Sequence, residues 1–213
     1  MKQHYPLAIV GAGPAGLTAA HDLALKKYRV TVFEKLPVAG GMMAVGIPSY
    51  RLPRDILKAE ISAIEEMGVD IRTGMTFGKD FNIQTLRSKG YSALFLATGL
   101  HGSRKLGVAG ENLSGVFDGV SFLRDVALGK KVSTAEKLIV VGGGNVAIDV
   151  ALTARRLGSK AVTIVCLETR QEMPACDDEI PGLDVCFGMK TATEVGGDYY
   201  DYLTAEGGAL VIA

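Results

Sequence analysis

The stretch "AIVGAGPAGL", residues 8–17, decides the fold because three glycines join a short apolar run to a helical pattern. Gly11 permits a tight turn, Gly13 lets a pyrophosphate approach the backbone, and Gly16 lets the helix pack closely on the strand. The start of such a helix also offers unpaired N–H groups and a positive dipole end to phosphates. The predicted contacts of this turn are Gly11, Gly13, Pro14, Ala15 and Gly16.

An acidic residue follows at the distance that such a site requires. The next apolar run, residues 29–34, ends in Glu34, eighteen residues beyond Gly16. A carboxylate at this position can accept both hydroxyls of an adenosine ribose. Strand, turn, helix, strand and acid follow in order, which favours a dinucleotide site over a purely structural turn. Lys35, the next residue, is included in the predicted site.

A second glycine-rich turn, "GGGNVA" at residues 142–147, repeats the pattern as its GxGxxA variant. The acid that ends its following strand is Glu168, twenty-one residues after Ala147. Two turns predict two bound nucleotides. A solvated strand end remains the alternative for Glu168. The predicted contacts here are Gly142, Gly144, Asn145, Val146, Ala147, Glu168 and Arg170.

Short β-branched runs alternate with helical patterns along the chain, which is typical of parallel βαβ units. We therefore expect an α/β, Rossmann-like fold with two dinucleotide-binding units. Residues 1–134 would form the first nucleotide-binding unit with its connection, 135–180 a partial second unit, and 181–213 an unfinished β-type tail. This tail has no helical period and stops inside an apolar run. The fold is accordingly expected to be truncated at its C-terminus.

Composition excludes several classes of function. Twenty-three basic residues balance twenty-three acidic ones, so no bulk field attracts nucleic acid or an anionic membrane. The sequence contains no run of eighteen apolar residues, so no membrane span is predicted. Its three cysteines have nine residues between neighbours, a spacing that fits neither a CxxC pair nor a zinc site. We expect a cytoplasmic protein without a bound metal.

Together with "GIPSYRLP" (46–53), "LATG" (96–99) and "EMPA" (172–175), these turns resemble the flavin oxidoreductases that include the glutamate synthase small chain and the nucleotide-binding part of dihydropyrimidine dehydrogenase. The resemblance spans residues 6 to about 175. It implies FAD in the first unit, NAD(P)H in the second, and hydride passing from the nicotinamide to the flavin. It assigns no catalytic acid or base, because the cofactor performs the chemistry. It adds to the FAD contacts Gly41, Thr98 and Gly99.

The choice of nicotinamide nucleotide and of electron acceptor follows from departures from that family. An acid at Glu168 favours a free ribose 2′-hydroxyl and hence NADH, whereas Arg170 leaves NADPH open. Many relatives carry an upstream iron–sulfur domain, whereas the first strand here starts near residue 7, so no cluster ligands are expected within this sequence. Electrons are therefore expected to leave through a partner subunit or a small acceptor. A homo-oligomer is left open.

The tail, residues 181–213, resembles the opening strands of bacterial metal-dependent serine/threonine phosphatases. That match would make Asp198 a metal ligand. A hard cation needs several oxygen ligands, and the tail supplies too few for a working phosphatase. An edge hairpin unrelated to phosphatases is the alternative for this segment. The rival function is a non-catalytic nucleotide-binding module or fragment fused to an incomplete phosphatase domain.

Overall fold

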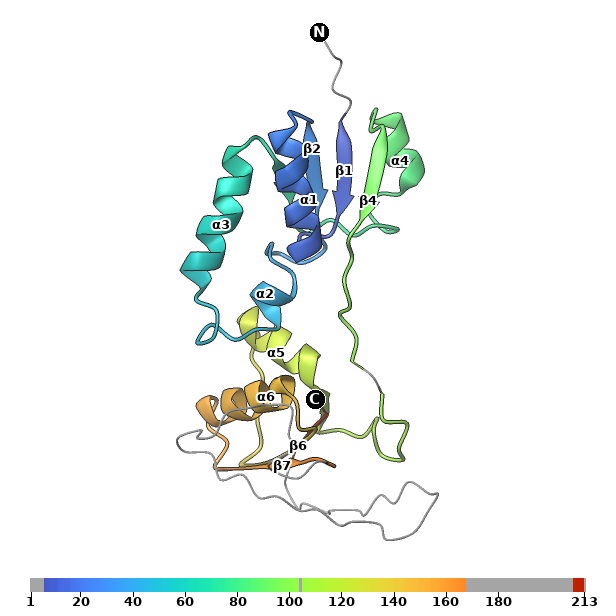
Figure 1. Ribbon diagram of the computed structural model, residues 1–213. Coiled ribbons are helices and arrows are strands. Elements are labelled where there is room, and N and C mark those ends of the chain that lie inside the picture. The colour runs from blue at the N-terminus through green and yellow to red at the C-terminus, as the bar shows by residue number, and fades with distance from the viewer. Residues whose placement is uncertain (1–5, 104, 168–208, 213) are drawn as a thin grey trace. The chain divides into compact units, whose positions relative to one another are not determined.

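The computed structural model describes residues 6–103, 105–167 and 209–212, within two compact units, Met1–His101 and Gly102–Ala213. Each unit contains a parallel sheet with helices, so the α/β, Rossmann-like fold expected from the sequence is confirmed (Figure 1). The division falls before the predicted connection ends at residue 134, because the strand and helix at residues 116–127 pack within the second unit. The nucleotide-unit boundaries at residues 134 and 180 stay a prediction.

Four parallel strands form the sheet of the first unit. Their order is β3-β2-β1-β4. Val10, the last residue of β1, pairs with Phe33 of β2 and with Leu96 of β4. The loops that follow these three strands therefore leave the same edge of the sheet. The strands are β1 (Leu7–Val10), β2 (Val30–Phe33), β3 (Asp70–Arg72) and β4 (Ala93–Leu96).

Residues of the helices and of the following loops pack with the sheet of the first unit in two apolar clusters. Residues of α1 and α3 pack with Ile9 and Val32 of the sheet in one core cluster. A second cluster contains Phe33, whose ring lies 4.5 Å from that of Phe81 and 6.0 Å from that of Tyr91, centroid to centroid. The two inner strands, β1 and β2, are thus buried on both faces, as strands of parallel sheets generally are. The helices are α1 (Pro14–Leu25), α2 (Met42–Val45), α3 (Arg54–Glu66) and α4 (Ile83–Ser88).

The second unit repeats this architecture with a sheet in the order β5-β8-β6-β7. Ala147, Ala151 and Ala154 of α6 are fully buried in its core cluster. Their small side chains let the helix backbone lie close to the strands. The elements are β5 (Val116–Asp118), α5 (Gly119–Ala127), β6 (Lys137–Val141), α6 (Asn145–Arg156), β7 (Ala161–Val165) and β8 (Ala209–Ile212).

The C-terminal strand β8 lies between β5 and β6 and pairs with both in parallel. The end of the expected β-type tail is therefore an inner strand of the second sheet, and the alternative of an edge hairpin is wrong for residues 209–212. The phosphatase-like stretch with Asp198 lies outside the described residues.

Neither a membrane span nor a metal cluster is found within residues 6–103, 105–167 and 209–212. No helix in these ranges combines the length and apolar character needed to cross a bilayer. The same ranges hold no cluster of three or more His, Cys, Asp or Glu side chains suited to a metal ion.

Helix α5 begins at a side-chain cap that the sequence analysis did not single out. The Oδ1 atom of Asp118 accepts a hydrogen bond from the backbone N–H of Ser121 at 2.6 Å. Burial alone would raise the pKa of Asp118, but hydrogen bonding from Ser121 and the nearby charge of Arg124 favour the ionised carboxylate, and the pKa lies below its ordinary value. The cap is therefore strongest when Asp118 is ionised.

Replacing Asp118 by alanine is expected to lower the free energy of unfolding by about 1 kcal/mol at pH 7. Because folding lowers the pKa of Asp118, its contribution is present above the unfolded pKa of about 3.9 and is lost as the pH falls through the folded value. D118N keeps an accepting oxygen without the charge, so it should lose less stability and should not share this pH dependence. Denaturant unfolding from pH 3 to 7 measures both variants. Equal stability of D118A and the parent protein at pH 7 would contradict the cap.

Candidate nucleotide-binding sites

Two glycines of the first turn are required by close backbone contacts. Gly11 has φ +108°, and its N–H donates to the carbonyl oxygen of Phe33 at 2.8 Å. A Cβ on Gly11 would collide with the carbonyl oxygen of Ala97, and one on Gly16 with the carbonyl oxygen of Gly11. The turn can therefore form only where both positions lack a side chain. This agrees with the packing roles predicted for these two residues.

Gly13 and Gly144, unlike Gly11 and Gly16, have no close neighbours that would exclude a side chain. Each is the N-cap residue of a helix in its own unit. A Cβ on Gly13 would have its nearest neighbour at 3.8 Å, and one on Gly144 would meet nothing within 4 Å. Both residues are in extended backbone that alanine also adopts. The packing of the chain thus does not require glycine at either position. We call the open space beside the N-cap glycine and the first N–H groups of each helix a cradle, one at Gly13 and one at Gly144. Such a space fits a pyrophosphate, because the first N–H groups of a helix have no intrahelical partner.

Glu34 lies where the ribose-binding acid is predicted, yet its carboxylate already organises the backbone. Its side chain is 3% exposed. Oε2 accepts from the N–H of Ala12 at 2.8 Å, and Oε1 accepts from the N–H of Leu36 at 2.9 Å. Glu34 therefore ties the glycine turn to the segment after β2. Each carboxylate oxygen can accept a second hydrogen bond, so a ribose hydroxyl remains chemically compatible with this role. Lys35 is exposed.

The remaining residues predicted for the first site come to the same edge of the sheet. The N–H of Gly40 donates to the carbonyl oxygen of Ala12 at 2.7 Å. Gly41 has φ +54°, and a Cβ on it would lie 2.7 Å from the Cα of Gly13. On the other side of the turn, a Cβ on Gly11 would lie 3.3 Å from the Cα of Thr98. The structure therefore brings Gly41 and Thr98 to the glycine turn. Pro14 and Ala15 are exposed at the start of α1, and Gly99 is exposed after β4.

The second turn has the same local geometry after β6. Gly142 has φ +133°, and its N–H donates to the carbonyl oxygen of Val165 at 2.8 Å. Asn145 and Val146 are exposed at the start of α6, whereas Ala147 is 1% exposed and packs in the core. Ala147 thus takes the packing role that Gly16 has in the first turn. Glu168 and Arg170 lie outside the described residues, so their places in this site stay a prediction.

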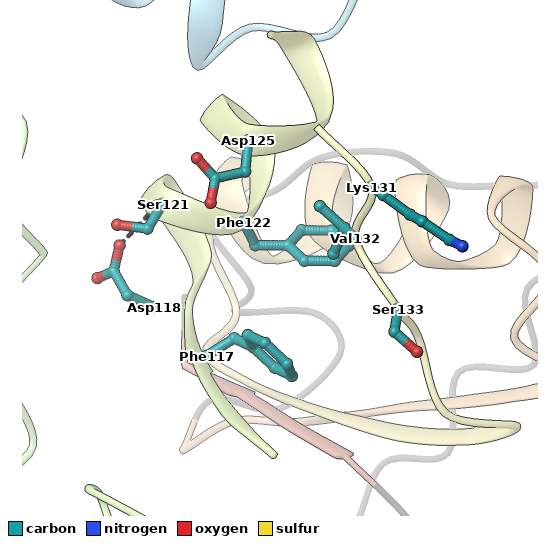
Figure 2. A pocket seen from close by; sticks show the side chains of 8 residues that line it. All are labelled: Phe117, Asp118, Ser121, Phe122, Asp125, Lys131, Val132 and Ser133. Carbon is teal, nitrogen blue, oxygen red and sulfur yellow. Dashed lines mark hydrogen bonds between the residues drawn. The ribbon is translucent and has the colours of Figure 1, made fainter. Parts of the chain in front are cut away.

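A pocket of about 240 Å³ in the second unit contains none of the predicted contacts (Figure 2). Two of its acidic groups already have structural partners. Asp118 caps α5, and the Oδ1 atom of Asp125 lies 2.7 Å from the Nζ atom of Lys130. We therefore do not assign a nucleotide to this pocket. Its lining residues are Phe117, Asp118, Ser121, Phe122, Asp125, Lys131, Val132 and Ser133.

Comparison with known proteins gives a consistent result. The family model described as pyridine nucleotide-disulphide oxidoreductase matches residues 5–182. The NADP(+)-dependent formate dehydrogenase subunit beta of Moorella thermoacetica is 52% identical over 177 residues, which are 82% of this chain and 25% of that protein. The NADPH-Fe(3+) oxidoreductase subunit beta of Geobacter sulfurreducens (strain DL-1 / KN400) is 45% identical over 191 residues, 86% of this chain and 28% of that protein.

A third relative differs in the nucleotide that its name carries. The NAD-dependent dihydropyrimidine dehydrogenase subunit PreT of Escherichia coli O157:H7 is 39% identical over 174 residues, 81% of this chain and 42% of that protein. The chain thus spans less than half the length of each of these three curated relatives.

Solved structures share the fold at lower identity. FprA of Mycobacterium tuberculosis in complex with NADPH has a TM-score of 0.65 and 23% identity, over 81% of this chain and 45% of that one. The 2-naphthoyl-CoA reductase has a TM-score of 0.73 and 20% identity, over 100% of this chain and 33% of that one.

The two classes of glycine should respond differently to an added methyl group. Gly16→Ala is expected to destabilise the first unit severely, because the Cβ meets a backbone oxygen. Gly13→Ala and Gly144→Ala should change the free energy of unfolding by no more than about 1 kcal/mol. Each of these two should nevertheless weaken ADP at its own site by about tenfold or more, since the Cβ enters the phosphate cradle. Denaturant unfolding and ADP titration give the two readouts. Full ADP affinity at both sites in G13A or G144A would contradict the assignment of the cradles.

Proposed function

Because the chain belongs to the pyridine nucleotide-disulphide oxidoreductase family, we propose that it is an FAD-dependent NAD(P)H oxidoreductase module that takes hydride from a nicotinamide nucleotide. Membership of this family implies FAD and NAD(P)H as cofactors. The observation that carries the proposal is the pair of open cradles at Gly13 and Gly144, one in each parallel α/β unit. A protein that holds a single nucleotide needs only one of them.

The residues of the chain supply binding and orientation. In the first unit, Gly13 would leave room for the pyrophosphate of FAD, Glu34 would accept from the adenosine ribose, and Gly41 adjoins the turn. In the second unit, Gly144 and Asn145 begin the helix that would face the phosphates of the nicotinamide nucleotide. FAD, when bound, supplies the hydride-accepting chemistry. The proposal accordingly assigns no acid or base of the chain to this half-reaction.

The proposed electron acceptor is a partner subunit. The names of the formate dehydrogenase and iron oxidoreductase relatives both contain "subunit beta", which supports this choice over a small diffusible acceptor. Both relatives extend well beyond the matched region.

Flavin content tests the proposal and distinguishes the two sites. After reconstitution and gel filtration, the full chain is expected to retain stoichiometric FAD, measured from its visible absorption. G13A should lose this flavin. G144A, the matched variant in the second unit, should retain it but lose reduction by NADH and NADPH. A full chain that cannot retain FAD would overturn the proposed function and favour a nucleotide-binding module without turnover.

For the nicotinamide nucleotide we propose NADH, on the strength of the acid at Glu168. The names of the relatives do not decide the matter, since two carry NADP(H) and one carries NAD. A carboxylate at the strand end repels a 2′-phosphate, whereas a guanidinium attracts it.

Replacing Glu168 by arginine should therefore shift the ratio of kcat/KM values toward NADPH by about tenfold or more. Glu168→Gln is the matched control, because it removes the charge without adding a guanidinium and should shift the ratio less. Steady-state rates with both nucleotides give the ratio. An unchanged ratio in E168R would show that Glu168 does not contact the ribose.

A further inference from the structure

The guanidinium of Arg54 holds three backbone carbonyls of one segment. Arg54 is the first residue of α3. Its Nη1 atom donates to the carbonyl oxygen of Met43 at 2.7 Å, and its Nη2 atom donates to that of Ile47 at 2.5 Å. A longer bond of 3.4 Å joins Nη1 to the carbonyl oxygen of Leu52. Burial lowers the pKa of Arg54 from its ordinary value. An arginine guanidinium in a protein nevertheless stays charged.

These bonds satisfy the C-terminal end of α2 and the turn after it. The last carbonyls of a helix have no intrahelical partner, and a cation near them also meets the negative end of the helix. A guanidinium presents several N–H donors in a fixed plane, so it can hold Met43 and Ile47 together. A lysine ammonium is a point donor and does not reproduce this geometry.

The opposite end of α2 adjoins the first glycine turn. Gly40 donates to Ala12, and Gly41 has its backbone so close to Gly13 that a Cβ would not fit. The segment that begins at Gly41 and ends at Leu52 is therefore held at both ends. The glycine turn holds one end, and Arg54 holds the other.

The order of the proposed contacts along the chain indicates which part of FAD would lie near the segment Met42–Leu52. Glu34 is the acid proposed to bind the adenosine ribose, and the backbone of Gly41 adjoins Gly13, the residue proposed to face the pyrophosphate. Helix α2 follows Gly41 and lies beyond the ends of β1 and β2 (Figure 1). In FAD, the pyrophosphate separates the adenosine from the flavin. With adenosine at Glu34 and pyrophosphate at Gly13, the segment Met42–Leu52 would lie on the flavin side of the pyrophosphate cradle.

Resting on the proposed function, we propose that Arg54 is a positioning residue that pre-orders Met42–Leu52 for the flavin half of FAD. It acts through the carbonyls of Met43 and Ile47 and does not itself contact the cofactor. Without it, the segment would have to become ordered when FAD binds, which opposes binding. The adenosine and pyrophosphate contacts at Glu34 and Gly13 do not depend on it.

The test compares FAD with ADP on the full chain. ADP contains the adenosine and pyrophosphate groups but lacks the flavin. R54A is expected to weaken FAD by about tenfold and ADP by less than about twofold. R54K should also weaken FAD binding, because lysine keeps the positive charge but lacks the planar set of N–H donors of the guanidinium. K58A is the matched control, since Lys58 is an exposed cation of the same helix, and it should change neither affinity.

Three results would overturn the proposal. Unchanged FAD affinity in R54A and R54K would show that Arg54 does not position the segment, and the proposed function would stand. An equal loss of FAD and ADP in both variants would show a general structural role. Failure of the parent chain to bind FAD would overturn the proposed function as well. If R54A does not unfold cooperatively, the FAD and ADP affinities of R54K are compared with those of the parent chain instead. Visible circular dichroism of the flavin bound to R54K then reports whether the surroundings of the ring have changed.

Discussion

The first unit depends on the contact of one backbone turn with its neighbours. Gly11 leaves β1 in a conformation that L-residues rarely adopt, and its Cα lies against the carbonyl of Ala97 after β4. Gly16 brings the first turn of α1 onto the carbonyl of Gly11. Since β1 is bonded to both β2 and β4, this turn fixes where all three strands end. The open cradle at Gly13 exists because the glycines beside it hold the helix start in place.

The second unit solves the same problem with a different residue set. Gly142 makes the turn, while Ala147 packs where the first unit needs Gly16. A methyl group is therefore tolerated at that contact in the second unit. Both units share the positive-φ glycine of the turn, Gly11 and Gly142, and both also have glycine at the helix N-cap, at positions 13 and 144. No packing contact demands glycine at the N-cap, so this second shared glycine is the one that a phosphate ligand would impose.

The sequence predicted the strands beside the two glycine turns and the packing roles of Gly11 and Gly16, because each depends on local spacing and conformation. It did not predict that Glu34 is buried and accepts from Ala12 and Leu36, since a strand-end acid looks the same whether it faces ribose or backbone. It also missed Arg54, whose partners are carbonyls that every residue carries. The inner position of β8 depends on its pairing with β5 and β6, which lie far away in the chain. An apolar run predicts a strand but does not indicate which strands will be its neighbours.

The central claim is that the two cradles hold two different dinucleotides that exchange hydride. The most direct measurement is the visible spectrum of the FAD-reconstituted full chain under anaerobic conditions, before and after adding NADH and, separately, NADPH. We expect the flavin bands to bleach, with the faster reaction for NADH. Flavin bands that remain unchanged with both nucleotides, in a protein that binds them, would contradict the central claim.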